Sequence, residues 1–159
     1  MSLYNRRKFI FLSLATTGCS FSPVYKSDVG PAFLRGKIVL PKPRSRDEYM
    51  LYSKLEENFG QLENPVFSLS VSYGVSSKGL GSLGSITRYN LIGNASFKLV
   101  NISTNALIIS EKLKAFTSYS ASSQTLATET AARAARDRLM MSIADQISTS
   151  IMMNYNTNQ

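Results

Sequence analysis

A strict alternation of apolar and polar side chains over residues 66–75 places the strongest constraint on the fold of this chain. The apolar positions are Phe67, Leu69, Val71, Tyr73 and Val75. Successive side chains of a β-strand point to opposite faces, so this segment predicts a strand with one buried and one exposed face. Residues 86–100 alternate in the same way. Two such strands favour an antiparallel sheet that is covered on one side only.

The segments around these two strands predict three more elements and a loop. Residues 37–40 predict a short first strand that ends at prolines, and Ser45 and Glu48 form an S-x-x-E capping box for a helix. A Gly/Ser-rich hairpin loop is expected over residues 76–85, and a third long strand over residues 107–119. The alternation in that third strand is less regular, and a β-bulge would account for it. The apolar stripe of the helix comprises Tyr52, Leu55, Phe59 and Leu62.

The C-terminal part of the chain predicts one long helix, capped by Ser122 or Ser123. Arg133 and Asp137 are expected to form an i,i+4 ion pair on its flank. The fold class is therefore α+β, a two-layer sandwich of two helices on a four-stranded, mostly antiparallel sheet in the order β-α-β-β-β-α. The first strand returns through a helix, so we expect it to pair in parallel with its neighbour. The apolar stripe of the long helix comprises Ala132, Ala135, Leu139, Ile143, Ile147 and Ile151.

The first residues follow the order of an export signal. A basic run at residues 6–8 precedes an apolar run at residues 9–15, small residues occupy positions 16–18, and Cys19 follows. The apolar run is far shorter than the ~20 residues that a membrane-spanning helix needs. A small residue directly before a cysteine resembles the lipobox of bacterial lipoproteins, in which the cysteine thiol receives a diacylglycerol. Residues 6–9 also resemble a twin-arginine signal, so the sequence leaves the export route open.

These features give an expected division of the chain. Residues 1–18 are a lipoprotein signal peptide, 19–35 a tether, 36–155 a single α/β sandwich domain and 156–159 a tail. Cys19 is the predicted lipid-attachment site, which would anchor the protein to a membrane; the alternative is a signal peptide with an incidental cysteine. Without residues 1–18 the chain has 15 basic and 10 acidic residues, a net charge of +5. That charge permits an anionic partner.

Composition excludes several kinds of chemistry. The chain has no histidine and a single cysteine, so it has neither an imidazole acid/base nor the ligands of a zinc site, and we expect no metal or cofactor. Residues 79–84 match G-x-G-x-x-G, but a strand follows them where a dinucleotide site needs a helix. No carboxylate pair suits hydrolysis, and only a Ser–Lys arrangement stays open. We therefore predict that the chain is not an enzyme and binds no nucleic acid.

Four basic residues on the polar faces of two predicted strands are the candidate binding residues. Arg88 and Lys98 lie on the second long strand, and Lys112 and Lys114 lie on the third. Together they would form a basic patch that suits phosphate or carboxylate groups. The alternative is a solvated sheet face on which lysine discourages edge pairing.

Several segments together resemble the lipopolysaccharide-assembly lipoprotein family (LptE). They are the mature N-terminus Gly18-Cys19-Ser20-Phe21-Ser22-Pro23-Val24-Tyr25, the strand Ala95–Val100 with its turn, the lysine-bearing strand that ends at Tyr119, and the final helix with Ala131-Ala132-Arg133 and Leu139–Ile151. This resemblance spans nearly the whole mature chain and rests on the order of elements more than on any single motif.

The resemblance implies a function. Members of that family sit on the periplasmic side of the outer membrane, insert into the lumen of the large β-barrel that exports lipopolysaccharide to the cell surface, and act as its plug and assembly partner. They also bind lipopolysaccharide. Arg88, Lys98, Lys112 and Lys114 would then meet lipid A phosphates or acidic core sugars. The alternative is a lipoprotein accessory subunit or activator of another envelope machine, such as a cell-wall synthase or a transporter.

Overall fold

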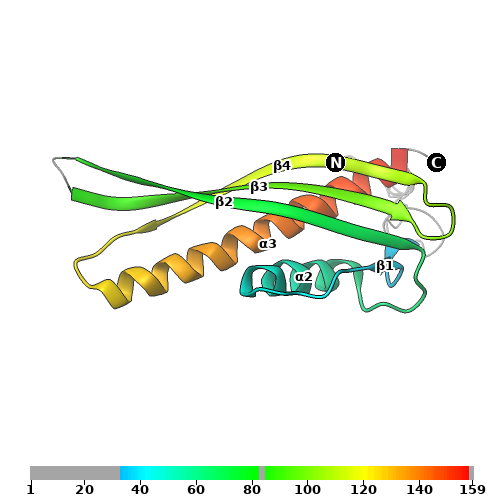
Figure 1. Ribbon diagram of the computed structural model, residues 1–159, viewed down its shortest axis with the longest axis horizontal. Coiled ribbons are helices and arrows are strands. Elements are labelled where there is room, and N and C mark those ends of the chain that lie inside the picture. Colours follow the sequence, from blue (N-terminus) through cyan, green and yellow to red (C-terminus); the bar gives the residue numbers. More distant parts are fainter. Residues whose placement is uncertain (1–32, 83–84, 158–159) are drawn as a thin grey trace, which may run out of the picture.

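The structure, a computed structural model, describes residues 33–82 and 85–157. It contains a four-stranded sheet and two helices in the predicted order β-α-β-β-β-α, which confirms the predicted fold class (Figure 1). Cys19 and the predicted signal peptide lie outside the described residues. The elements are β1 (Ile38–Val39), α2 (Arg46–Phe59), β2 (Phe67–Ser82), β3 (Ser85–Asn101), β4 (Leu107–Ser120) and α3 (Thr125–Thr157).

The strands of the sheet follow the chain order β1-β2-β3-β4. β1 pairs in parallel with β2 at two positions, and the other two pairings are antiparallel. Both helices lie against the same face of the sheet, and the long axis of the molecule follows the strands (Figure 1). α2 covers only part of the length of the strands, whereas α3 runs along most of it. Neither of the two described helices therefore lies on the other face of the sheet.

The core forms between the odd-numbered side chains of the long strands and the inner faces of both helices. Phe97 and Leu99 of β3 are almost fully buried, and so are Leu139 and Ile143 of α3. Gly93 allows this close packing, because a Cβ atom built there would lie 2.9 Å from Cδ1 of Ile143. The absence of a side chain at this position brings α3 close to the middle of β3.

The predicted cap is present at the start of α2, but it differs from a capping box in one bond, because Glu48 binds the backbone N–H of Arg44 and not that of the N-cap residue Ser45. The Ser45 hydroxyl accepts a hydrogen bond from the backbone N–H of Glu48 at 3.2 Å, and the Glu48 carboxylate accepts one from the backbone N–H of Arg44. Gly60, with φ of 80°, follows the last turn, and its N–H donates to the Glu56 carbonyl. These contacts bind the backbone groups that a helix leaves unpaired at its ends.

Two ion pairs join the helices and correct one prediction. Arg46 binds Asp137 at 2.8 Å, and Arg136 binds Asp47 at 2.6 Å. The predicted Arg133–Asp137 pair is wrong, because Asp137 faces α2 and is taken by Arg46. Arg133 instead approaches Glu129 of its own helix at 3.9 Å.

The predicted hairpin loop over residues 76–85 is also wrong for most of its length. β2 continues to Ser82 and pairs with β3 throughout, with one irregularity in the register beside Leu80. The predicted stripe of α2 loses Leu62, which lies beyond the helix and is 52% exposed. α3 begins at Thr125, a few residues after the predicted caps. The side chain of one of them, Ser122, accepts a hydrogen bond from the Gln124 N–H at 3.3 Å.

The first described residues pack against the sandwich. Leu34, which falls in the predicted tether, is fully buried. Phe33 stacks on Tyr155 of α3 with ring centroids 5.7 Å apart, and the amine of Lys37 lies 3.2 Å from the centre of the Phe33 ring. Among the described residues, no helix combines the length and the apolar character needed to cross a membrane.

Candidate binding face of the sheet

We call the face of the sheet opposite the helices the open face. It consists of the even-numbered residues of β2 from 68 to 80, of β3 from 88 to 100 and of β4 from 110 to 120. Serine and asparagine make up much of it, and its charged residues are all basic. They are Lys78, Arg88, Lys98, Lys112 and Lys114, and all five are exposed.

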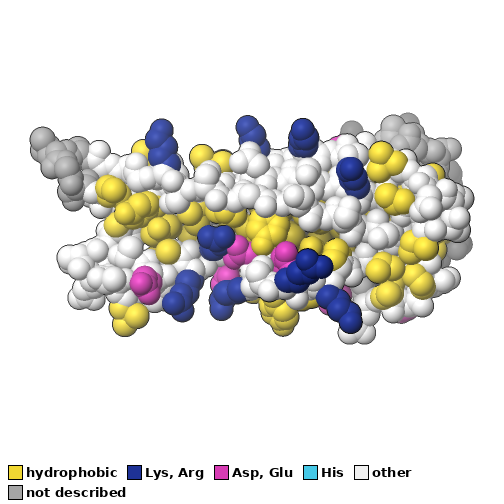
Figure 2. All heavy atoms as spheres, viewed as in Figure 1, with side chains coloured by type: hydrophobic (Ala, Val, Ile, Leu, Met, Phe, Trp, Pro, Cys, Tyr) yellow, Lys and Arg dark blue, Asp and Glu magenta, His cyan; other side chains and the backbone are white. Residues whose placement is uncertain are grey.

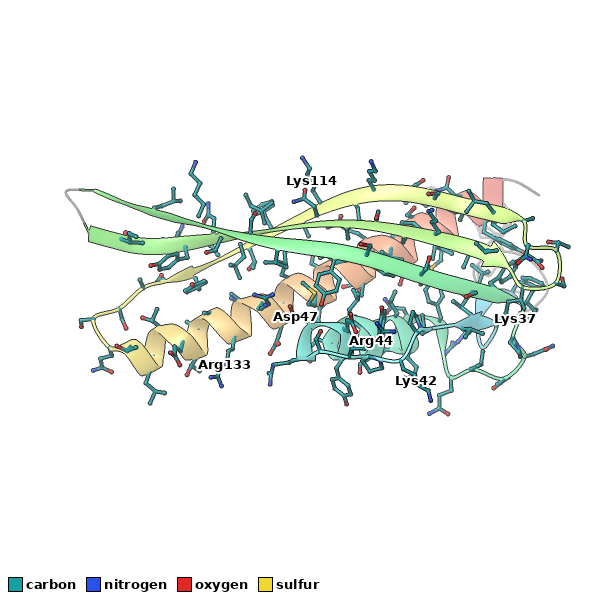
Figure 3. The ribbon with its side chains drawn as sticks, in the orientation of Figure 1. Lys37, Lys42, Arg44, Asp47, Lys114 and Arg133 are labelled. Carbon is teal, nitrogen blue, oxygen red and sulfur yellow. The ribbon has the colours of Figure 1, made fainter. Side chains whose placement is uncertain are left out.

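The structure brings three of the four predicted binding residues together. Lys112 and Lys114 are successive open-face residues of β4, opposite Ser96 and Asn94. Lys98 of β3 is opposite Ser110, one row away from Lys112 on the same face. Rows of side chains on one face of a strand repeat every ~7 Å, so the three amines form one cluster. Figure 3 shows Lys114 pointing away from both helices.

Arg88 does not belong to this lysine cluster. It lies opposite Ser120, three rows along β3 from the row of Asn94 and Lys114, which corresponds to about 20 Å along the sheet. Its nearest basic neighbour on the open face is Lys78, which lies opposite Asn90. Sequence reasoning missed Lys78 because that residue was placed in a loop. The length of the strand predicted over residues 86–100 could have indicated that residues 76–82 are also in a strand, since a long strand needs an equally long partner.

The one carboxylate of β4 is turned to the other face. Glu111 lies in sequence between Ser110 and Lys112, which are open-face residues, but its own side chain points toward α3. There its carboxylate accepts hydrogen bonds from Ser150 Oγ and from Asn154 Nδ2, the latter at 2.8 Å. None of the ion pairs found within residues 33–82 and 85–157 involves a cation of the open face. The positive potential of this face is therefore not neutralised by acidic side chains of its own sheet.

A shallow hollow of about 550 Å³ lies in the middle of the open face, beside the lysine cluster. Gly74 of β2 lines the hollow on the side opposite β4, and a Cβ atom built there would meet no atom within 4 Å. Ser72, Asn94 and Ser96 contribute polar groups, and Lys112 and Lys114 line the side formed by β4. The hollow thus combines hydrogen-bonding groups with two cations, a combination whose chemistry suits phosphate or carboxylate groups.

Two apolar side chains interrupt the polar surface next to this hollow. Phe116 of β4 is 83% exposed, the highest value among the large hydrophobic residues that the structure describes. It lies directly opposite Ile92 of β3, which is 37% exposed. This apolar pair occupies the row that follows Asn94 and Lys114 and separates the lysine cluster from Lys78 and Arg88.

The opposite side of the molecule has a different character. Figure 2 shows basic and acidic side chains intermingled over the helices, whereas the charged side chains that stand out along the sheet side are basic. Over the helices, a hydrogen bond from Arg46 to Asp137 raises the pKa of the guanidinium, and burial raises the pKa of the Tyr52 phenol. Within the described part of the chain, no cluster of acidic or cysteine side chains could hold a metal ion.

Solved structures share this architecture. Rare lipoprotein B from Shewanella oneidensis superposes with a TM-score of 0.54 at 16% identity, over 72% of this chain and 91% of that one. A minor lipoprotein from Acinetobacter baumannii gives 0.54 at 24% identity, over 74% and 90%. A protein from Caulobacter crescentus gives 0.65 at 15% identity, over 81% and 96%. At these identities the likeness shows the fold alone. No curated protein sequence matches the chain.

The sequence profile of a family described as lipopolysaccharide-assembly (LptE) matches residues 37–151, which span every strand and helix up to the last turns of α3. This is the family that the sequence resembles. Its members are lipoproteins of the bacterial envelope that serve lipopolysaccharide assembly and are not enzymes. The match covers well over half of the chain, and the chain belongs to the lipopolysaccharide-assembly (LptE) family.

Proposed function

We propose that this protein is an outer-membrane lipoprotein, anchored through Cys19 on the periplasmic side, that acts as plug and assembly partner of the β-barrel exporting lipopolysaccharide. We further propose that it binds lipopolysaccharide on its open face. Arg88, Lys98, Lys112 and Lys114 would contact the phosphates of lipid A or the acidic sugars of the core. Membership of the LptE family supports the role in assembly.

The observation that supports lipopolysaccharide binding is the positive charge of the open face. Five exposed cations and no carboxylate lie on a surface that neither α2 nor α3 covers, while the other face of the same sheet packs against both helices in the core. Each basic side chain close to an anionic lipid surface contributes about 1 kcal/mol of attraction at physiological ionic strength. Several together give binding that weakens as salt screens them.

The shape of the molecule supports the plug role. The long strands and α3 run side by side, which gives an elongated body with helices on one side and a polar sheet surface on the other (Figure 1). Serine and asparagine hydroxyl and amide groups hydrate readily, so such a body suits a water-filled lumen. The lipid on Cys19 would hold this body at the membrane in which the barrel is built.

Co-purification tests the assembly role. The full-length tagged protein is isolated in mild detergent from envelopes of its native bacterium, and its partners are identified by mass spectrometry. We expect a large outer-membrane β-barrel in a stoichiometric amount, and a loss of stably folded barrel when the protein is depleted. Recovery of a cell-wall synthase or a transporter in its place would refute the proposal in favour of the other envelope function.

Lipopolysaccharide binding needs a separate test with a matched control. Lys98→Glu with Lys112→Glu reverses two charges of the open face, and Lys42→Glu with Arg44→Glu makes the same charge change at exposed positions on the helix side (Figure 3). We expect the first pair to weaken binding about tenfold or more at moderate salt and the second pair to leave it nearly unchanged. Equal effects of both pairs would show that net charge acts without a site.

A further inference from the structure

The apolar pair Phe116 and Ile92 does not follow from a role in binding phosphate. An isolated exposed hydrophobic residue is common on protein surfaces. This pair is different, because two apolar side chains are direct cross-strand neighbours on a face otherwise rich in serine, asparagine and lysine. Phe116 adds nothing to the core, from which it points away, and its exposure of 83% leaves the ring in water.

We propose that the open face recognises an anionic amphiphile by both of its parts: the phosphorylated headgroup occupies the hollow at Gly74 against Lys112 and Lys114, and the adjoining acyl chain lies on Phe116 and Ile92. This inference rests on the proposed function and deepens it. It assigns Phe116 and Gly74 to a binding site in which neither charge nor sequence pattern would place them.

The arrangement along the sheet favours this ligand over a purely polar one. The hollow and the apolar pair occupy successive rows, about 7 Å apart, so one molecule with a headgroup and a chain can contact both. The complementary charge comes from Lys112 and Lys114 at the hollow and from the basic character of the whole face. Burying a phenylalanine ring against a chain adds a contribution that salt does not screen.

A substitution at Gly74 tests the same site independently of Phe116. A side chain at this position would project into open space, so a larger residue should fill the hollow without displacing its neighbours. Gly74→Leu should therefore preserve the fold and exclude the headgroup. Phe116→Ser removes an exposed ring and should likewise leave the melting temperature unchanged. Tyr49→Ser is the matched control, since Tyr49 is an exposed aromatic residue of α2, at 60% exposure, on the other side of the molecule.

The experiment measures binding of the full-length protein and its variants to two probes at several salt concentrations. One probe is lipid A in detergent micelles, and the other is the same phosphorylated glucosamine disaccharide without acyl chains. We expect Phe116→Ser to weaken lipid A binding about tenfold or more and to change disaccharide binding less than twofold. Gly74→Leu should weaken binding of both probes, and Tyr49→Ser of neither.

Three results would overturn the inference, and they bear differently on the proposed function. If Phe116→Ser binds lipid A like the native protein while Lys112→Gln with Lys114→Gln binds it weakly, the inference fails and the proposed lipopolysaccharide binding stands. If the native protein binds neither probe but co-purifies with its barrel, lipid binding fails and the assembly role stands. If Phe116→Ser keeps lipid binding but loses the barrel, the open face is a protein-docking surface.

Discussion

Gly93 offers the most direct test of how α3 packs on the sheet. The change is Gly93→Ala, which adds one methyl group at the point where helix and strand are closest. The new Cβ atom would lie 2.9 Å from Ile143 Cδ1 and 3.3 Å from both Cγ and Cδ2 of Leu139. Such distances are shorter than van der Waals contact, and both neighbours are fully buried, so neither side chain has free space to enter.

The expected cost follows from this geometry. Overpacking a buried site by one methyl group destabilises a protein by about 1–3 kcal/mol, because side chains leave their preferred rotamers or the helix moves outward. The higher strand propensity of alanine than glycine offsets roughly 0.5–1 kcal/mol of this. We therefore expect a net loss of about 0.5–2 kcal/mol in the free energy of unfolding, measured by urea denaturation of the purified protein.

Two further variants make the result specific. Gly74→Ala adds the same methyl group on the open face, where it meets nothing within 4 Å, so we expect no loss of stability and a small gain. Ile143→Val removes the closest atom, so the double variant Gly93→Ala/Ile143→Val should be more stable than the sum of the two single changes predicts. If Gly93→Ala is as stable as the native protein, α3 does not pack on β3 as described.

Three other changes test local features of the fold. Ser45→Ala removes the acceptor for the Glu48 N–H and should cost about 1 kcal/mol of stability, measured by thermal unfolding. Gly36→Ala should cost about 1–2 kcal/mol, because Gly36 has φ of 68° and its new Cβ atom would lie 3.1 Å from the Gln61 carbonyl oxygen. The raised pKa of Tyr52 means that the folded state holds the phenol proton more tightly than the unfolded state does. The stability that this proton contributes is complete below the ordinary tyrosine pKa and is lost as pH rises through the folded pKa. Tyr52→Phe should therefore reduce the loss of stability at alkaline pH, measured by unfolding from pH 8 to 11.

Sequence periodicity predicted the elements whose buried residues repeat regularly. The alternation in residues 66–75 and 86–100 predicted the two central strands, and the spacing from Ala135 to Ile151 predicted the long helix. The far half of β2 escaped prediction because residues 76–82 extend beyond the core and contain mostly serine and glycine. Pairing with β3, rather than burial, holds that segment in the sheet, and pairing leaves no apolar pattern in a sequence.

The candidate binding face was predicted in part for a similar reason. Strand alternation placed Arg88, Lys98, Lys112 and Lys114 on polar faces, and the register confirms that all four share one side of the sheet. The separation of Arg88 from the three lysines depends on strand register, which alternation alone does not fix. The same limit explains the incorrect Arg133 pair, since the crossing of two helices decides which charges meet.

A photocrosslinking measurement in living cells tests the central claim that lipopolysaccharide binds to the open face. A photoreactive amino acid replaces Phe116 on the open face or Tyr49 on α2, both of which are exposed. The account predicts that lipopolysaccharide is captured from position 116 and not from position 49. Capture of lipopolysaccharide from position 49 and none from position 116 would contradict it.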